Sequence, residues 1–214
     1  MSSSFSSNST LRPKITPFET TERILKTVRE MLADRGYVET PKASWSEYHN
    51  EAADLKCVAR LDQDTLFVYF ATDIKVPVKK AREYVAHMAK GNITHAIVVH
   101  ASQITSGASG EFYETAKTVK EYDFELFKAG ELYENPTHHF AVPRHEKVAS
   151  EEEVVQIMKK FHIKTKSDFP IIYPSDIIIR YYHWPVGTIV RVFRKLGALQ
   201  EPGIYYRCIR DWQK

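Results

Sequence analysis

The stretch Pro185-Val-Gly-Thr-Ile-Val-Arg-Val-Phe-Arg194, followed by Ile204-Tyr-Tyr-Arg207, decides the fold of the carboxy-terminal third of this chain. Apolar and polar side chains alternate over Thr188–Phe193 and again over Ile204–Ile209. Such a period of two is typical of β-strands. The pattern predicts a two-stranded antiparallel ribbon whose strands are joined by the loop from Lys195 to Gly203.

This ribbon is a candidate partner-binding surface. Two strands alone are only marginally stable and leave unpaired backbone groups along an edge. We therefore expect the ribbon to add to the sheet of another chain, with Tyr205 or Tyr206 supplying apolar contact. The alternative is that one of these tyrosines packs inside its own domain.

Arginines near the ribbon are the second part of this hypothesis, because a guanidinium can grip a carboxylate through two parallel hydrogen bonds. Exposed strand charges that only discourage aggregation would look the same in sequence. The candidates for partner contact are Arg180, Tyr181, Arg194 and Arg207, with Arg191 as a weaker one.

Helices are expected before the ribbon. Ser150 with Glu153 forms a capping-box pattern at the start of an amphipathic helix over Ser150–Phe161. Pro170 and Pro174 interrupt the next segment, after which Ser175 can cap a short helix that carries Tyr181. The region from 137 to 214 is thus predicted to be a small α+β domain.

The first part of the chain has the pattern of an α/β domain. A helix is expected from Thr20 or Thr21 to Gly36, with one apolar face. A short helix around Trp45 should precede strands at Lys56–Leu61 and Thr65–Ala71. The apolar face of the first helix consists of Ile24, Leu25, Val28, Met31 and Leu32.

A parallel crossover is expected next. A helix over Val78–Met88, ended by Gly91, leads to a buried strand at Ile93–Val99, and a strand, helix and strand in this order favour parallel pairing. We further predict a loop at 101–110, a helix near 111–119 and a strand at 122–127. The turn Glu134-Asn-Pro-Thr137 then marks the domain boundary, so that residues 1–16 are a Ser-rich disordered head and 17–136 the first domain.

Composition limits the classes of protein to consider. The chain has 214 residues, 43% of them hydrophobic and 12% aromatic, which is ample for packed cores. Only Cys57 and Cys208 are present, without the spacing of a metal site, which fits a reducing compartment. No signal peptide or membrane-length apolar run is visible, so we expect a soluble intracellular protein.

Charge is unevenly distributed along the chain. From Phe140 onward there are 13 Lys and Arg against 8 Asp and Glu, a net charge of +5, whereas the first 139 residues carry −2. A basic region of this size could favour nucleic acid or an acidic protein groove, but it is also compatible with an ordinary solvated surface.

Several blocks of the chain, in order, resemble the small subunit shared by eukaryotic nuclear RNA polymerases, whose assembly domain is equivalent to a small archaeal RNA polymerase subunit. The matching blocks lie in both predicted domains. They are His139–His145, Ser150–Phe161, Ser175–Tyr182, Pro185–Arg194 and Ile204–Arg207, and, more thinly, Asp34–Tyr37, Lys75–Met88 and Asn92–Val99.

The resemblance implies a jaw domain of nuclease-like topology followed by the assembly domain. It implies a non-catalytic subunit without a cofactor of its own, anchored to the largest polymerase chain and other subunits, not a homo-oligomer and with no membrane partner. Downstream duplex DNA would be a weak, sequence-independent partner. The location would be the nucleus, or the cytoplasm or virion if the source is viral.

Two positions depart from the family pattern. Thr105-Ser106-Gly107-Ala108 corresponds to a Thr-Pro-Ser-Ala loop that approaches DNA in the family, and it lacks the proline. Lys195-Leu-Gly-Ala198 stands where a Ser-Glu-Thr-Ala stretch is usual. Both differences suggest a diverged copy. A small polar loop can still contact phosphates through backbone amides and the Thr105 hydroxyl.

Catalytic alternatives are weaker. Asp54, Asp73 and Lys75 could present two carboxylates to Mg²⁺ and an amine to phosphate, as in metal-dependent nucleases, although an acidic-x-Lys triplet often occurs by chance. A free-standing DNA-binding module is a third possibility. His138, His139 and His145 lack the Cys or carboxylate neighbours of a zinc site, so no metal site is predicted.

Overall fold

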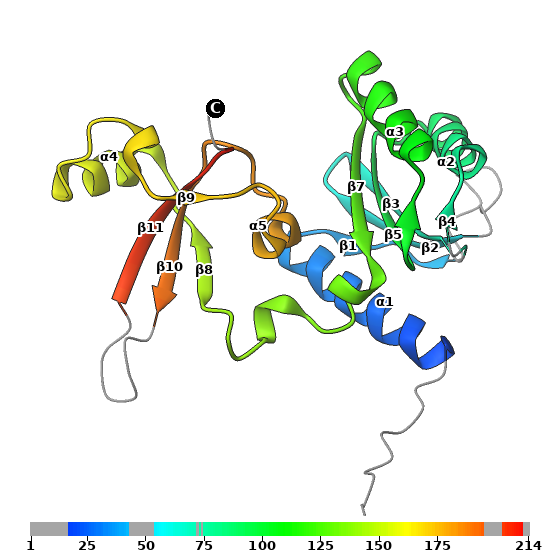
Figure 1. Ribbon diagram of the computed structural model, residues 1–214, viewed down its shortest axis with the longest axis horizontal. Coiled ribbons are helices and arrows are strands. Elements are labelled where there is room, and N and C mark those ends of the chain that lie inside the picture. Colours follow the sequence, from blue (N-terminus) through cyan, green and yellow to red (C-terminus); the bar gives the residue numbers. More distant parts are fainter. Residues whose placement is uncertain (1–16, 43–53, 72, 74, 195–202, 212–214) are drawn as a thin grey trace, which may run out of the picture.

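The computed structural model describes residues 17–42, 54–71, 73, 75–194 and 203–211. The predicted head, the helix around Trp45 and the ribbon loop from Lys195 lie outside these residues. The described chain forms two main sheets, each with its own helices (Figure 1). None of the helices in these ranges is long and apolar enough to cross a membrane.

A five-stranded sheet organises the first region, in the order β1-β2-β3-β5-β7. The first two pairings are antiparallel and the last two are parallel. The predicted parallel crossover is therefore confirmed. The strands are β1 (Val38–Glu39), β2 (Leu55–Leu61), β3 (Asp64–Ala71), β5 (His95–His100) and β7 (Asp123–Lys128).

Alternation along β3 gives this sheet two buried faces. Phe67 and Tyr69 pack toward α2 (Val78–Gly91) and α3 (Ser106–Thr118), whereas Val68 and Phe70 belong to the core that contains α1 (Pro17–Asp34). Because successive strand side chains point to opposite faces, one apolar strand serves both layers. Each large side chain buried in this way stabilises the fold by roughly 1.5–3 kcal/mol.

Helix α1 confirms the predicted apolar face, since all five of its predicted residues are buried. The helix begins at Pro17, earlier than expected. It ends where Gly36 takes a φ of 90°, a left-handed conformation that costs glycine little. Helix α2 extends beyond the predicted Met88 and includes Gly91, because Asn92 and not Gly91 supplies the left-handed residue that ends it.

The predicted loop at 101–110 is wrong, because this segment contains a strand and the start of a helix. Gln103–Ile104 forms β6, which pairs in parallel with β4 (Lys75–Val76), and α3 begins at Ser106. The Thr105 hydroxyl accepts from the Ala108 amide at 3.1 Å and donates to the Val76 carbonyl at 3.0 Å. This cap, with burial of Ala108, outweighs the low helix propensity of the Ser and Gly residues in the first turns.

The second region contains a four-stranded sheet in the order β8-β10-β11-β9, which corrects the predicted two-stranded ribbon. The predicted pair is present as β10 and β11, antiparallel to one another, and the two added strands are too short to show an alternating pattern. The strands are β8 (Arg144–Lys147), β9 (Ile171–Ile172), β10 (Ile189–Arg194) and β11 (Gly203–Ile209).

Two helices cover opposite faces of this sheet. Helix α4 (Glu151–Lys160) is capped by Ser150 as predicted, while α5 (Ile177–Tyr182) is capped by Asp176 and not by Ser175. Short 3-10 turns at Ala129–Glu131, Pro136–His138 and Lys166–Asp168 connect the elements. Figure 1 shows α5 beside α1, where the two regions of the chain meet.

Candidate partner interface and domain junction

Tyr181 joins the two regions of the chain. Its side chain is fully buried and belongs to the core formed by α1 and the five-stranded sheet, although α5 follows that sheet by some fifty residues. Its hydroxyl donates to Asp34 Oδ2 at 2.8 Å and accepts from Asn135 Nδ2 at 3.1 Å. Burial, reinforced by Asp34, raises the pKa of Tyr181. Its contacts are thus made within the chain.

Arg35 forms the most buried charged contact of this junction. Its guanidinium meets Glu125 in a bidentate pair, with Nη1–Oε1 at 2.7 Å and Nη2–Oε2 at 2.8 Å. The same guanidinium donates to the backbone carbonyls of Tyr181 at 2.7 Å and Arg180 at 2.8 Å. Since the two side chains are only 4% and 7% exposed, these bonds satisfy charges that water cannot reach.

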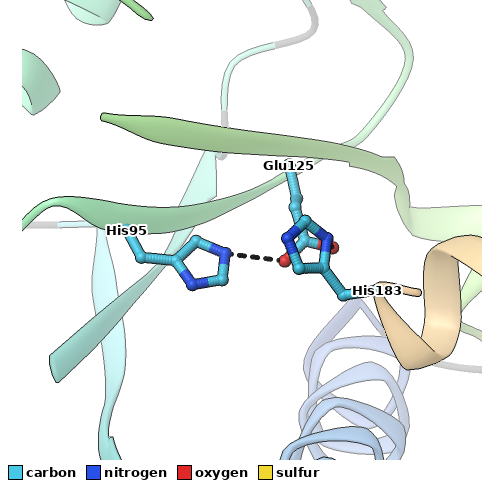
Figure 2. A group of neighbouring side chains, drawn as sticks. All are labelled: His95, Glu125 and His183. Carbon is cyan, nitrogen blue, oxygen red and sulfur yellow. Dashed lines mark hydrogen bonds and ion pairs between the residues drawn. The ribbon is translucent and has the colours of Figure 1, made fainter. Parts of the chain in front are cut away.

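Two histidines complete this cluster on β5 and at the end of α5 (Figure 2). His95 Nε2 lies 2.8 Å from Glu125 Oε1, and His183 Nδ1 lies 3.4 Å from Glu125 Oε2. His183 Nε2 also lies 2.8 Å from Asp123 Oδ2. The left-handed backbone of His183, with φ at 54°, ends α5 and places the ring between the two carboxylates.

The protonation of the cluster follows from these contacts. Hydrogen bonds with Asp123 and Glu125 raise the pKa of His183 to about 10, so the ring is a cation at neutral pH. Burial alone would raise the pKa of Glu125, but hydrogen bonds from His183, His95 and Arg35 outweigh it and hold that pKa well below its usual range. The carboxylates of Asp123 and Glu125 therefore lie against the cationic side chains of His183 and Arg35.

His95, Glu125 and His183 are also the only three potential metal ligands that lie within reach of one ion among the described residues. The charge balance argues against an ion. A metal would have to displace the His183 proton and compete with Arg35 for the oxygens of Glu125. The geometry supports a junction between the two regions of the chain that is held by ion pairs.

Arg180, a predicted partner-binding residue, is also engaged inside the chain. Its Nη1 donates to Glu131 Oε1 at 2.9 Å, and Nη2 donates to the Leu126 carbonyl. Its guanidinium carbon lies 4.4 Å from the centre of the Phe127 ring, a cation–π arrangement. Arg180 thereby links α5 to β7 and to the turn that follows.

Strand β11 presents a different surface. On the side away from β10 it pairs only with β9, through Cys208 and Ile209, so within the described residues no strand covers Gly203–Arg207. Ile204 is 48% exposed and Tyr205 42% exposed on this stretch. An uncovered strand edge with apolar side chains is a template for pairing with another chain.

The two tyrosines of β11 have separate positions. Tyr206 is half-buried against the core that contains α4, with its ring centre 5.7 Å from that of Phe161 and 5.9 Å from the Arg191 guanidinium carbon. Tyr205 lies on the opposite face and is exposed. Of the predicted arginines, Arg207 donates to the Ile171 carbonyl at 2.7 Å, and Arg194 is exposed at the end of β10.

The residues of the nuclease alternative do not form a free metal site. Asp54 is buried and its Oδ2 accepts from the Tyr84 hydroxyl at 2.9 Å and from Lys80 Nζ at 2.6 Å. Asp73 and Lys75 are exposed. The carboxylate that would bind Mg²⁺ is therefore already bound by an ammonium and a hydroxyl, and the nuclease hypothesis has no support.

The predicted DNA-proximal segment lies at the amino end of α3. Thr105 uses its hydroxyl for the cap, Ala108 is buried, and Ser106 and Gly107 are exposed. A Cβ at Gly107 would lie 2.6 Å from Val78 Cγ2, so α2 packs closely against this position. Only glycine fits there without a shift of neighbouring atoms.

Comparisons with known proteins bear on both regions. The family model described as "RNA polymerase Rpb5, C-terminal domain" matches residues 134–209. The Dictyostelium discoideum protein named DNA-directed RNA polymerases I, II, and III subunit rpabc1 is 32% identical over 194 residues, which cover 87% of this chain and 96% of that protein.

Two further relatives have similar names. The Caenorhabditis briggsae RPABC1 subunit of RNA polymerases I, II and III is 30% identical over 80% of this chain and 87% of that protein. The Arabidopsis thaliana RNA polymerase V subunit 5A is 30% identical over 84% of this chain and 83% of that protein. A solved structure of a protein of unknown function is matched with a TM-score of 0.36 and 12% identity over 70% of this chain and 81% of that one, too distant to bear on the fold.

Proposed function

Since this chain belongs to the RPABC1 (Rpb5) family of DNA-directed RNA polymerase subunits, we propose that it acts as a non-catalytic structural subunit of such an enzyme. The observation that carries this proposal is the likeness to a polymerase subunit over 96% of that protein's length, which includes both regions of the fold. The buried and ion-paired state of Asp54 agrees with a role outside catalysis.

The carboxy-terminal region, from about residue 137, is proposed to be the assembly domain that anchors the protein to the largest polymerase chain. The uncovered part of β11 supports this, because Gly203–Arg207 can extend a partner's sheet through its backbone. Ile204 and Tyr205 supply apolar area beside that edge.

The amino-terminal region is proposed to form part of the jaw near downstream duplex DNA, with the nuclease-like topology that the family resemblance implies. Exposed Ser106 and Gly107 in the first turn of α3 can offer backbone amides to phosphates without reading sequence. Exposed Lys79 and Lys90 on α2 can add long-range attraction. The nucleus follows as the proposed location.

Tagging the chain in its native source and weighing what co-purifies tests this proposal. We expect the large polymerase chains in stoichiometric yield. Removal of Met1–Pro13 should leave incorporation intact, and removal of Phe140–Lys214 should abolish it. The second deletion also removes Tyr181 from the core that contains α1 and can therefore unfold the chain. A variant that changes only surface residues is needed.

A double substitution on the exposed edge provides that variant. We expect Ile204→Lys with Tyr205→Lys to lower incorporation by at least about thirtyfold, since central apolar contacts commonly contribute about 1–2 kcal/mol each and 1.4 kcal/mol is a factor of ten. Tyr113→Lys on α3 is the matched control, being exposed far from the edge. Normal incorporation of a folded double variant would refute the role of β11, and absence of any polymerase chain would refute the function itself.

A further inference from the structure

A groove of about 1060 Å³ lies on the surface where the linker, α5 and the end of β10 meet. The linker, from Thr137 to His145, lines one side, and Tyr182, Phe193 and Arg194 line the other. The groove is distinct from the outer edge of β11, because its strand residues belong to β8 and β10, whereas that edge faces away from β10.

Phe140 is the unusual feature of this groove. Its side chain is 96% exposed although it lies on the groove lining, and its ring stacks on His139, with centres 4.8 Å apart. A phenylalanine left in water forgoes roughly 1.5–3 kcal/mol that burial would supply. Another chain seated in the groove would recover that free energy.

The charges of the lining are mostly of one sign. Arg144 and Arg194 are its cations, and Asp34 is its one carboxylate among the described lining residues. Asp34 already accepts from the Tyr181 hydroxyl. Arg194 has no acidic partner in the described part of the chain, whereas Arg144 pairs with Glu146 and lies 5.3 Å from the Phe193 ring centre.

We infer that this groove binds an acidic segment of another polymerase subunit, whose apolar side chain packs on Phe140 and whose carboxylate pairs with Arg194. The inference rests on the proposed function and adds a second docking surface to the β11 edge. Complementary charge would orient the segment, while ring burial would supply affinity.

Protein is favoured over nucleic acid by the small number of cations. Burial lowers the pKa of His145, so that side chain adds no charge at neutral pH. Two arginines are few for a duplex, whose binding usually depends on several phosphate contacts. The rings of Phe140, Tyr182 and Phe193 suit an apolar anchor better than a phosphate chain.

Photo-crosslinking in the assembled enzyme tests the inference. Phe140 is replaced by p-benzoylphenylalanine in the full tagged chain, the polymerase is purified, and the linked peptide is identified by mass spectrometry. We expect a link to a segment of another polymerase subunit that has more Asp and Glu than Lys and Arg. Arg194→Glu should lower the yield of that link about tenfold, since it replaces attraction by repulsion.

Matched variants separate charge from fold. Arg194→Lys should restore most of the link, and Lys159→Glu, an equal charge reversal on exposed α4, should leave it unchanged. A link to DNA or to a basic segment, no link in a normally assembled enzyme, or a link insensitive to Arg194→Glu would overturn the inference and leave the proposed function standing. A chain that never assembles would overturn both.

Discussion

Helix α5 and strand β11 belong to the same region of the chain, yet the surface around α5 is covered and the outer edge of β11 is not. Around α5 the charges, hydroxyls and rings have partners from the first region, and Arg35, Glu125 and Tyr181 are all buried. Along β11 a strand edge and two apolar side chains stay open in the described structure. The described chain thus covers the surface around α5 with its own residues and leaves the edge of β11 uncovered, and this edge is the surface proposed to bind a partner.

Matched substitutions on the two surfaces test whether they differ in stability. The largest effect is expected from Arg35→Met, which leaves Glu125 buried without its bidentate partner and should lower the free energy of unfolding by about 4 kcal/mol. Arg194→Met on the open side should change it by less than about 0.5 kcal/mol. Urea unfolding followed by circular dichroism measures both. Equal losses would contradict the contrast.

Apolar truncation should give the next largest difference. Ile179 on α5 packs against Val190 and Val192 of β10, and Ile179→Ala should cost about 3 kcal/mol through lost burial and the cavity left behind. Ile204→Ala should cost below about 1 kcal/mol, because that side chain is half exposed already. Urea unfolding measures both variants. A large loss of unfolding free energy for Ile204→Ala would show that the edge of β11 is covered in the free chain.

Removal of a single hydroxyl on each surface tests the same difference with a smaller change. Tyr181→Phe takes away the group that donates to Asp34 and accepts from Asn135, so we expect a loss of about 1–2 kcal/mol. Tyr205→Phe should leave stability within about 0.5 kcal/mol. Thermal and chemical unfolding should agree on the order. If Tyr181→Phe left the free energy of unfolding unchanged, water would have to replace the hydrogen bonds to Asp34 and Asn135.

The smallest expected effect is a pH dependence at the junction. The pKa of folded His183, about 10, lies above the ordinary value of 6.5, so its stabilisation is complete below about pH 6.5 and is lost as pH rises through 10. The ring is 43% exposed, and solvent screening reduces the effect to the order of 1 kcal/mol.

Comparison with His183→Gln isolates this effect from other titrating groups. Between pH 7 and pH 10 the wild type should lose more unfolding free energy than the variant. Imidazole NMR shifts should also show a protonated His183 at about pH 8. A ring that titrates near pH 6.5 would disprove the ion pair with Asp123 and Glu125.

The elements with strong periodicity could be predicted from sequence. The apolar face of α1, the parallel crossover through α2 and the Ser150 cap all follow from side-chain spacing, and the structure confirms them. The helix at Ser106 could not be predicted in the same way. Its first turns are rich in Ser and Gly, and tertiary packing on Val76 and Val78 decides the conformation.

The junction also escaped prediction, because its parts are far apart in sequence. Arg35 and Tyr181 are separated by 146 residues, and His95 lies at the start of a buried strand whose next four residues are apolar. A charged or titratable side chain in such a strand was the one available signal of a buried partner. The resemblance to the polymerase subunit is confirmed by the relatives, while the positions of the domain boundary and of the partner contacts stay predictions.

Tyr181 completes a core whose other members begin at Ile24. During synthesis the end of α1 and the edge of β7 therefore stay uncovered until residue 181 has left the ribosome. Fragments that stop at the linker would expose Arg35 and Glu125 without the carbonyl and imidazole groups that α5 brings. The order of translation thus makes docking of α5 the step that closes the part of the protein made first.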